Sequence, residues 1–309
     1  MPFARLVLPT IAGLLFLARL SDVSMAEEVT TSNEQPRANF EEVGAQESSL
    51  WLADYRVGID TAKSTGQMLL LWFYEPGAAE ANAHFAREVL SESGIQTQLA
   101  TMTTVRLPLD AETVVDGKPI RVLSHPAFAE MLGRPGLAII DQRDAQSPHF
   151  GRVVSVYPFV KLPIEREMLA VLLDLPYGSL TQRTLLFAVR THPERPQSAW
   201  SHTSVLLTQE TQQHAHHQAA IRVQGHHNWD RRFHSINARL PSGLVANEVC
   251  AESWPGQTLV EAAEECVDCW RKSSGHWDHV RQRHVFFGYD MQRGRNGVWY
   301  AAGIFASQR

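Results

Sequence analysis

The sequence predicts an α/β fold, because segments with the pattern of buried strands alternate with segments that have the period of amphipathic helices. Met68–Tyr74 is a continuous apolar run bounded by turn residues, which is typical of a strand buried on both faces. Residues 259–270 place their apolar side chains on one stripe, as a helix that covers a core does. With 309 residues, of which 44% are apolar, the chain is long enough to form two domains.

The first half of the chain alternates between helix and strand patterns. Glu75-Pro-Gly77 ends the first strand, and Gly133-Arg-Pro-Gly136 leads into the third. An alternation of this kind predicts a sheet with helices packed on it. The expected helices are 50–63, 78–91, 125–132 and 164–175, and the expected strands are 68–74, 103–109, 137–141 and 151–157.

Residues 50–176 resemble a thioredoxin-like domain in this order of segments and in the position of Pro135. In that family, a strand like Met68–Tyr74 ends in a Cys-x-x-Cys loop, and the proline that matches Pro135 has a cis peptide bond. Here the loop reads Glu75-Pro-Gly-Ala-Ala-Glu80 and contains no cysteine. Because a thiolate is the nucleophile in disulfide exchange, we expect this domain, at 49–190, to be redox-inactive and to have a structural or partner-docking role.

A helix at 181–189 is expected to join the two halves. Residues 192–198 include two prolines among polar residues, so we place a semi-rigid linker at 191–200 and a second domain at 201–309. The second domain should contain a helix, an extended segment, the amphipathic helix, an abrupt Ser-Ser-Gly-His-Trp turn and two closing strands. These segments are 205–223, 244–250, 259–270, 273–277, 287–290 and 298–305.

The order of these segments resembles the CAP superfamily (cysteine-rich secretory proteins, antigen 5 and pathogenesis-related proteins) in its compact bacterial form. Asn247-Glu-Val-Cys-Ala251 stands where the family has a Gly-Glu-Asn segment. Cys269-Trp-Arg-Lys-Ser-Ser-Gly-His276 stands for its Trp…Ser-x-Gly-His segment, and two closing strands around a Gly-rich hairpin follow. The resemblance implies an SCP-like α-β-α sandwich with a central cleft.

The resemblance also implies that two histidines and one or two glutamates line this cleft. Carried over residue by residue, these are His276, Glu248 and either His226 or His227, which the sequence does not separate. A further glutamate of the family falls on Ser273 and is therefore absent. The three groups could hold Zn²⁺ with a water as fourth ligand, or form a structural cluster in which Glu248 orients two imidazoles.

Other histidines and the cysteines are expected to be structural. His214, His216 and His217 cluster on the first long helix, and His214 and His217 share one of its faces. We interpret this face as polar and solvated, because no His-Glu-x-x-His pattern is present; the alternative is a metal-binding face. The lone Cys266-Val-Asp-Cys269 motif favours a buried thiol or a disulfide bond from Cys250. Two more histidines are expected at the surface or behind the cleft: His279 and His284.

The N-terminus, residues 1–26, has the features of a signal peptide. One positive charge and a short apolar run precede Ser24-Met25-Ala26, a small-x-small cleavage site. The rival interpretation is an uncleaved membrane anchor. Residues 27–48 are polar and acidic without a period, which predicts a disordered lead-in. We therefore expect export to the periplasm, the cell envelope or the medium.

The composition limits the classes of partner. A net charge of -5 argues against nucleic acid. We expect an exported two-domain protein whose CAP-like domain binds an unknown envelope or extracellular ligand. The alternative is a metal-dependent hydrolase that uses the His/Glu/His cleft, although no independent nucleophile motif is present.

Overall fold

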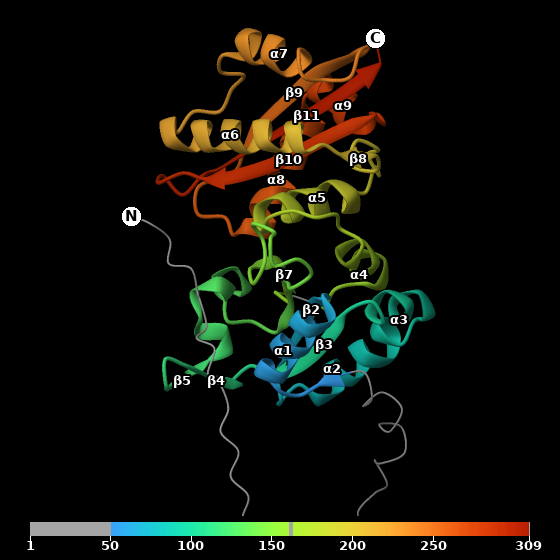
Figure 1. Ribbon diagram of the computed structural model, residues 1–309, viewed down its shortest axis with the longest axis vertical. Coiled ribbons are helices and arrows are strands. Elements are labelled where there is room, and N and C mark those ends of the chain that lie inside the picture. Colours follow the sequence, from blue (N-terminus) through green and yellow to red (C-terminus); the bar gives the residue numbers. More distant parts are fainter. Residues whose placement is uncertain (1–50, 161–162, 309) are drawn as a thin grey trace, which may run out of the picture. The chain divides into compact units, whose positions relative to one another are not determined.

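Two main sheets, each packed with helices, make up the computed structural model, and this mixture confirms the predicted α/β class (Figure 1). The structure describes residues 51–160 and 163–308, which belong to one unit extending over Val43–Arg309. The predicted signal peptide at 1–26 and the lead-in at 27–48 lie outside the described residues. Within the described part, no helix is long and apolar enough to cross a membrane.

Strand β2 (Met68–Tyr74) lies in the middle of the first sheet, whose order is β1-β3-β2-β6-β7. It pairs in parallel with β3 and antiparallel with β6. Its side chains alternate between two cores, so that Leu70 and Trp72 enter one and Leu71 and Phe73 enter the other. The apolar run is therefore a strand buried on both faces, as predicted. The other strands are β1 (Trp51–Leu52), β3 (Thr103–Pro108), β6 (Gly136–Asp141) and β7 (Val153–Pro158).

The helices of the first half differ from the predicted ones mainly at their ends. The first helix begins at Tyr55 and not at residue 50, because the Asp54 carboxylate caps it by accepting a hydrogen bond from the Val57 backbone N–H. The helix predicted at 125–132 is a kinked 3₁₀ segment that stops at Leu132, whose backbone is left-handed. The helices here are α1 (Tyr55–Thr65), α2 (Ala79–Phe85) with the π turn Ala86–Leu90, α3 (Ser93–Leu99) and α4 (Arg166–Leu173).

Several features of the first half were not expected from the sequence, among them helix α3 and strand β1. Strands β4 (Glu112–Val115) and β5 (Lys118–Arg121) form a separate hairpin. Among the described residues no peptide bond is cis, so Pro135 lacks the cis geometry that the thioredoxin resemblance implies. Pro135 and Glu75 instead line a pocket of 120 Å³ beside the carboxyl end of β2.

Helix α5 (Leu180–Thr191) confirms the helix expected between the halves and packs against β7 as well as against α8 (Leu259–Lys272) and β10 (Phe286–Arg293). All of its residues from 182 to 189 are buried. Near its start, the Thr181 hydroxyl and the Gln182 amide both donate hydrogen bonds to the buried Asp290 carboxylate, at 2.7 and 3.0 Å. Such polar contacts in a low-dielectric interior fix the position of the helix.

The segment predicted as a linker at 191–200 is packed against the second half. Glu194 pairs with Arg271, and the buried Ser198 hydroxyl lies 2.7 Å from the Tyr289 hydroxyl. These contacts explain why the segment, although rich in proline and polar residues, is ordered in the structure. The predicted division into domains at this point stays a prediction.

The second sheet has the order β8-β10-β11-β9, with helices on both faces (Figure 1). Helix α6 and the shorter α7 cover one face, while α5, α8 and α9 pack on the other. Gly288 permits close approach of α6, because a Cβ atom there would lie 2.4 Å from the backbone carbon of Leu207. The remaining elements are β8 (His202–Thr203), β9 (Leu244–Glu252), β11 (Trp299–Gln308), α6 (Val205–Ile221), α7 (Trp229–Asn237) and α9 (Ser274–Arg281).

Arg183, on α5, should be a main determinant of stability, because it is fully buried and donates hydrogen bonds to the Ser155 hydroxyl and the carbonyls of Leu175 and Pro176. Replacing it with Ala would leave these acceptors unsatisfied in the core. We expect Arg183→Ala to lower the free energy of unfolding by about 3 kcal/mol, measured by urea denaturation. The exposed Arg166→Ala is the control and should change it by less than about 0.5 kcal/mol. A similar small change in Arg183→Ala would contradict this role.

Candidate functional site

His226, Glu248 and His276, three of the four residues predicted to line the cleft, lie together in the second half. The Nδ1 atom of His226 is 3.1 Å from Oε1 of Glu248, and its Nε2 atom is 3.3 Å from Nε2 of His276. The fourth residue, His227, lies apart, with its Nε2 atom 3.1 Å from the Val223 carbonyl. The structure thus separates the two histidines that the sequence left equivalent.

Three different elements bring these side chains together. Glu248 is on β9, the edge strand of its sheet, where residues from both helical layers can meet. His226 is in the loop after α6, which ends at Arg222 in the left-handed conformation and so turns back earlier than the predicted end at 223. His276 was expected on a tight turn but is in the first turn of α9. Ser273 connects α8 to α9 at this point.

The Glu248 carboxylate is fully buried and has a cation on its other side. Nη1 of Arg232, on α7, lies 2.6 Å from Oε2 of Glu248, and Nε2 of His214, on α6, lies 3.7 Å from Oε1. Burial alone would raise the pKa of Glu248, but the hydrogen bond from His226 and the hydrogen bond and charge of the Arg232 guanidinium lower it. Glu248 is therefore ionised at neutral pH.

The hydrogen bonds assign the imidazole tautomers. A carboxylate only accepts, so Nδ1 of His226 carries the proton and its Nε2 atom has a lone pair in the neutral form. His214 donates from Nε2 to the Gly225 carbonyl at 2.9 Å. Burial lowers the pKa of His214 to about 4, and burial followed by the charge of His226 lowers the pKa of His276. His214 and His276 are consequently neutral at pH 7.

Cys250 lies two residues after Glu248 on the same face of β9, with its sulfur 3.8 Å from Nδ1 of His226. Burial raises its pKa well above the ordinary value, so it is a thiol and not a reactive thiolate. Cys250, Cys266 and Cys269 are all free, so the disulfide bond considered from the sequence is not formed, whereas the alternative of a buried thiol holds for Cys250 and Cys266.

Two sets of potential ligands therefore adjoin each other. The inner set is His214, Glu248 and Cys250, whose ligand atoms all lie within 4.8 Å of one another and could hold a metal ion. The outer pair is His226 and His276, in which the His226 side chain is 41% exposed. The inner set is buried, and only the outer pair is accessible to a ligand from solvent.

Sequence reasoning did not place His214, Arg232 or Cys250 at this site. His214 was interpreted as part of a solvated helix face, but it is buried together with Gln218, one turn further along α6. The i, i+4 spacing of two residues able to form hydrogen bonds was the available signal. For Cys250 the signal was its two-residue spacing from Glu248 on a strand. Nothing in the sequence pointed to Arg232.

Two further histidines occupy different environments. His284, expected at the surface or behind the cleft, is buried, with Nδ1 2.7 Å from the Ser307 hydroxyl and its ring stacked on Phe305 at 4.5 Å. His279 is partly buried, and its backbone carbonyl oxygen lies 2.7 Å from Nε2 of His284, at hydrogen-bond distance. His284 thus connects β11 to α9, whereas His279 contributes to the lowered pKa of His276 in the outer pair.

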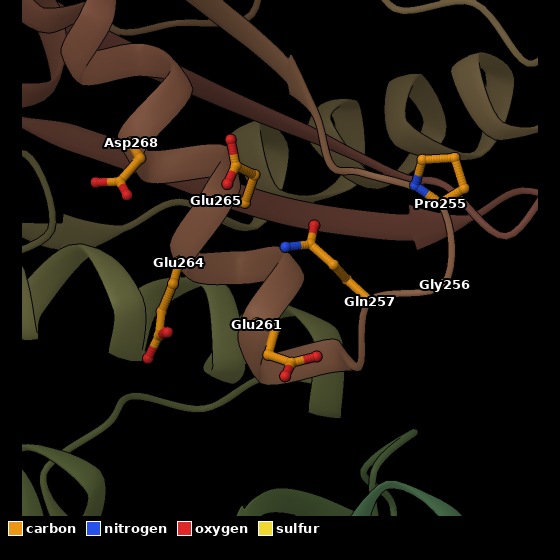
Figure 2. A pocket seen from close by; sticks show the side chains of 7 residues that line it. All are labelled: Pro255, Gly256, Gln257, Glu261, Glu264, Glu265 and Asp268. Atoms are coloured by element: carbon orange, nitrogen blue, oxygen red, sulfur yellow. The ribbon is translucent and has the colours of Figure 1, made fainter.

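A separate acidic pocket of 450 Å³ lies along α8, where four carboxylates follow successive turns of the helix (Figure 2). Their local contacts are ordinary for a helix surface. Glu261 completes a capping box with Thr258, and Glu265 lies 3.7 Å from the Lys272 ammonium. Burial, followed by the charges of Asp268 and Glu261, raises the pKa of Glu264. The pocket is lined by Pro255, Gly256, Gln257, Glu261, Glu264, Glu265 and Asp268.

Comparison with known proteins provides no relative from which to assign these residues. No protein-family model matches the sequence, and no curated protein is significantly similar to it. The thioredoxin-like and CAP-like resemblances therefore stay predictions.

The buried His214 should make stability depend on pH. With a pKa of about 4 in the folded chain and an ordinary value of 6.5, the unfolded chain binds a proton between these values that the folded chain does not. The free energy of unfolding should therefore fall by about 2 kcal/mol more in the wild type than in His214→Gln between pH 7 and pH 4.5, measured with a metal chelator present. The exposed His234→Gln is the control and should retain the wild-type slope. An unchanged slope in His214→Gln would disprove the assignment.

Proposed function

We propose that the chain is an exported two-domain protein whose CAP-like half binds a transition-metal ion, zinc in the first instance, through His226 and His276. The metal would then form part of a binding site for an envelope or extracellular ligand. The observation that carries this proposal is the 3.3 Å separation of the two Nε2 atoms, with Glu248 hydrogen-bonded behind His226.

The geometry of the outer pair suits a tetrahedral metal site. Two nitrogen ligands with zinc bonds of about 2.0–2.1 Å lie about 3.4 Å apart in a tetrahedron, close to the separation seen here. A carboxylate on the far nitrogen is the usual partner of a metal-binding histidine, since it fixes the tautomer and raises ligand basicity. In this arrangement Glu248 orients a ligand and is not itself one. His276 needs only to carry its proton on Nδ1 to offer the second lone pair.

Two protein ligands leave coordination positions open, at which a bound metal ion could take up a further ligand. A bound metal ion would supply Lewis acidity and an attachment point for an oxygen, nitrogen or sulfur ligand. The metal-dependent hydrolase considered from the sequence would also need a base to activate water. Glu248 does not meet this need, because its carboxylate is fully buried between His226 and Arg232. We therefore favour ligand binding as the role of this site.

The order and directions of the strands in the first sheet support the proposal of a thioredoxin-like first half. The loop after β2 contains no cysteine, and its Glu75 borders a pocket lined mainly by apolar groups. A docking or structural role for this half is consistent with both features. Helix α5, packed against both sheets, would hold it in place beside the binding half.

Metal binding by the outer pair predicts a sharp difference between adjacent histidines. We expect His226→Ala and His276→Ala each to weaken Zn²⁺ binding by about 100-fold or more, because one of two nitrogen ligands is lost. Isothermal titration of the purified protein measures this directly. His227→Ala is the matched control, since His227 is the next residue in the chain yet contacts Val223, and it should bind zinc as the wild type does. Equal effects of His226→Ala and His227→Ala, or no zinc binding at all, would reject the proposal.

Export predicts a defined mature N-terminus. Cleavage after Ala26 would leave Glu27 as the first residue, because Ser24-Met25-Ala26 has the small side chains that signal peptidase requires. We expect expression of the full chain in a Gram-negative host to place it in the envelope or periplasmic fraction with this N-terminus, measured by mass spectrometry. Cytosolic protein that retains Met1, or an uncleaved form in the membrane fraction, would contradict it.

A further inference from the structure

Arg232 places a positive charge directly beside the inner set. Its guanidinium lies 2.6 Å from Oε2 of Glu248, whose side chain is fully buried, and its own side chain is only 17% exposed. The ring of Trp229, 5.4 Å away, packs against it on α7. A guanidinium cannot lose its proton at any ordinary pH, so this charge is constant.

The charges at the inner set already balance without a metal ion. The carboxylate of Glu248 and the guanidinium of Arg232 form a buried ion pair of one negative and one positive charge, with Oε2 and Nη1 2.6 Å apart. A divalent cation bound there would lie within a few ångströms of the guanidinium, in a buried region where repulsion is weakly screened.

We infer that Arg232 acts as a built-in counter-cation that closes the inner set to metal ions and directs them to the outer pair. This inference rests on the proposed metal binding by His226 and His276. Arg232 would then determine which of the two ligand sets binds the metal ion. The choice is between the outer pair of nitrogen ligands, which is open to solvent, and the buried inner set, which contains a thiol. Without Arg232, Glu248 would keep an unbalanced negative charge beside Cys250 and His214, which a metal ion could neutralise.

His214 raises a second, smaller obstacle at the inner set. Its Nε2 proton is donated to the Gly225 carbonyl, so that nitrogen offers no lone pair in this structure. An imidazole can carry its proton on either nitrogen, and a metal ion can displace a proton from a ligand. The Nε2 proton of His214 therefore hinders metal binding less than Arg232 does, because the proton can move and the charge of Arg232 is permanent.

Cobalt(II) tests this inference, because a thiolate ligand gives Co²⁺ a charge-transfer absorption in the near ultraviolet that nitrogen and oxygen ligands do not give. In the wild type, we expect bound Co²⁺ without this band. In Arg232→Met, which keeps an unbranched apolar stem but not the charge, we expect the band to appear and Co²⁺ affinity to rise about tenfold or more. The double variant Arg232→Met/Cys250→Ser should lose the band.

Controls separate charge from packing. Arg232→Lys retains the cation and should show no band. Arg231→Met removes an exposed positive charge from the neighbouring position and should behave as the wild type. If Arg232→Met does not fold, as judged by near-ultraviolet circular dichroism, Arg232→Gln replaces it. A thiolate band in the wild type, or none in a folded uncharged variant at position 232, would overturn the inference.

Failure of the inference can be distinguished from failure of the proposed function. The proposed function fails if His276→Ala binds zinc as tightly as the wild type does. The inference concerns Cys250 and is decided by the thiolate band, which can be measured in Arg232→Met whatever the outer pair does. A band in Arg232→Met that survives His276→Ala would support it independently.

Discussion

The buried carboxylate of Glu248 is the constraint around which the second half is organised. An ionised carboxylate removed from water costs several kcal/mol unless cations and hydrogen-bond donors surround it. Here its partners come from three other segments, α6, α7 and the loop between them, which supply His214, Arg232 and His226. Satisfying one charge thus fixes how these segments lie on the edge strand β9, and it aims His226 at His276.

A rigid framework is needed to keep such a cluster in register. Helix α5 provides part of this framework. Its first turn donates hydrogen bonds to the Asp290 carboxylate on β10, and Arg183, on the same helix, donates one to Ser155 in the first sheet. Buried polar contacts of this type are directional, so they define one arrangement where apolar packing would tolerate several. Asp290 in the second sheet and Ser155 in the first, both bound to α5, therefore contribute to the position of the site.

The sequence predicted elements wherever one strong local pattern was present. The apolar run of β2 and the apolar stripe of α8 were both found, because each pattern reflects burial of a single element. The turn predicted at 273–277 became the first part of α9, since Ser-Ser-Gly looks like a break although tertiary packing of Trp277 and Val280 stabilises a helix there. The short hairpin of β4 and β5 was missed although its two-residue turn, Asp116-Gly117, has the sequence and the positive φ angles typical of a hairpin.

The site was predictable only as far as its residues belong to recognisable segments. His276 and Glu248 were found through the segments that carry them, and the choice between His226 and His227 depended on the left-handed turn at Arg222, which periodicity does not encode. Arg232 could not be found, because an arginine after Trp229 on a surface helix has no local mark of burial. Its partner is 16 residues away on a strand, so the pairing exists only in the folded chain.

The contrast between the two adjacent ligand sets follows from the same electrostatics. A carboxylate that has a permanent cation on one oxygen and an imidazole N–H on the other has little capacity left for a metal ion. It can still polarise the imidazole, whose far nitrogen becomes a better ligand at the surface. Burying the charge and exposing the lone pair divides the two tasks between Glu248 and His226. This division allows a metal-binding pair to form at the surface while the ionised group that orients it stays protected from solvent.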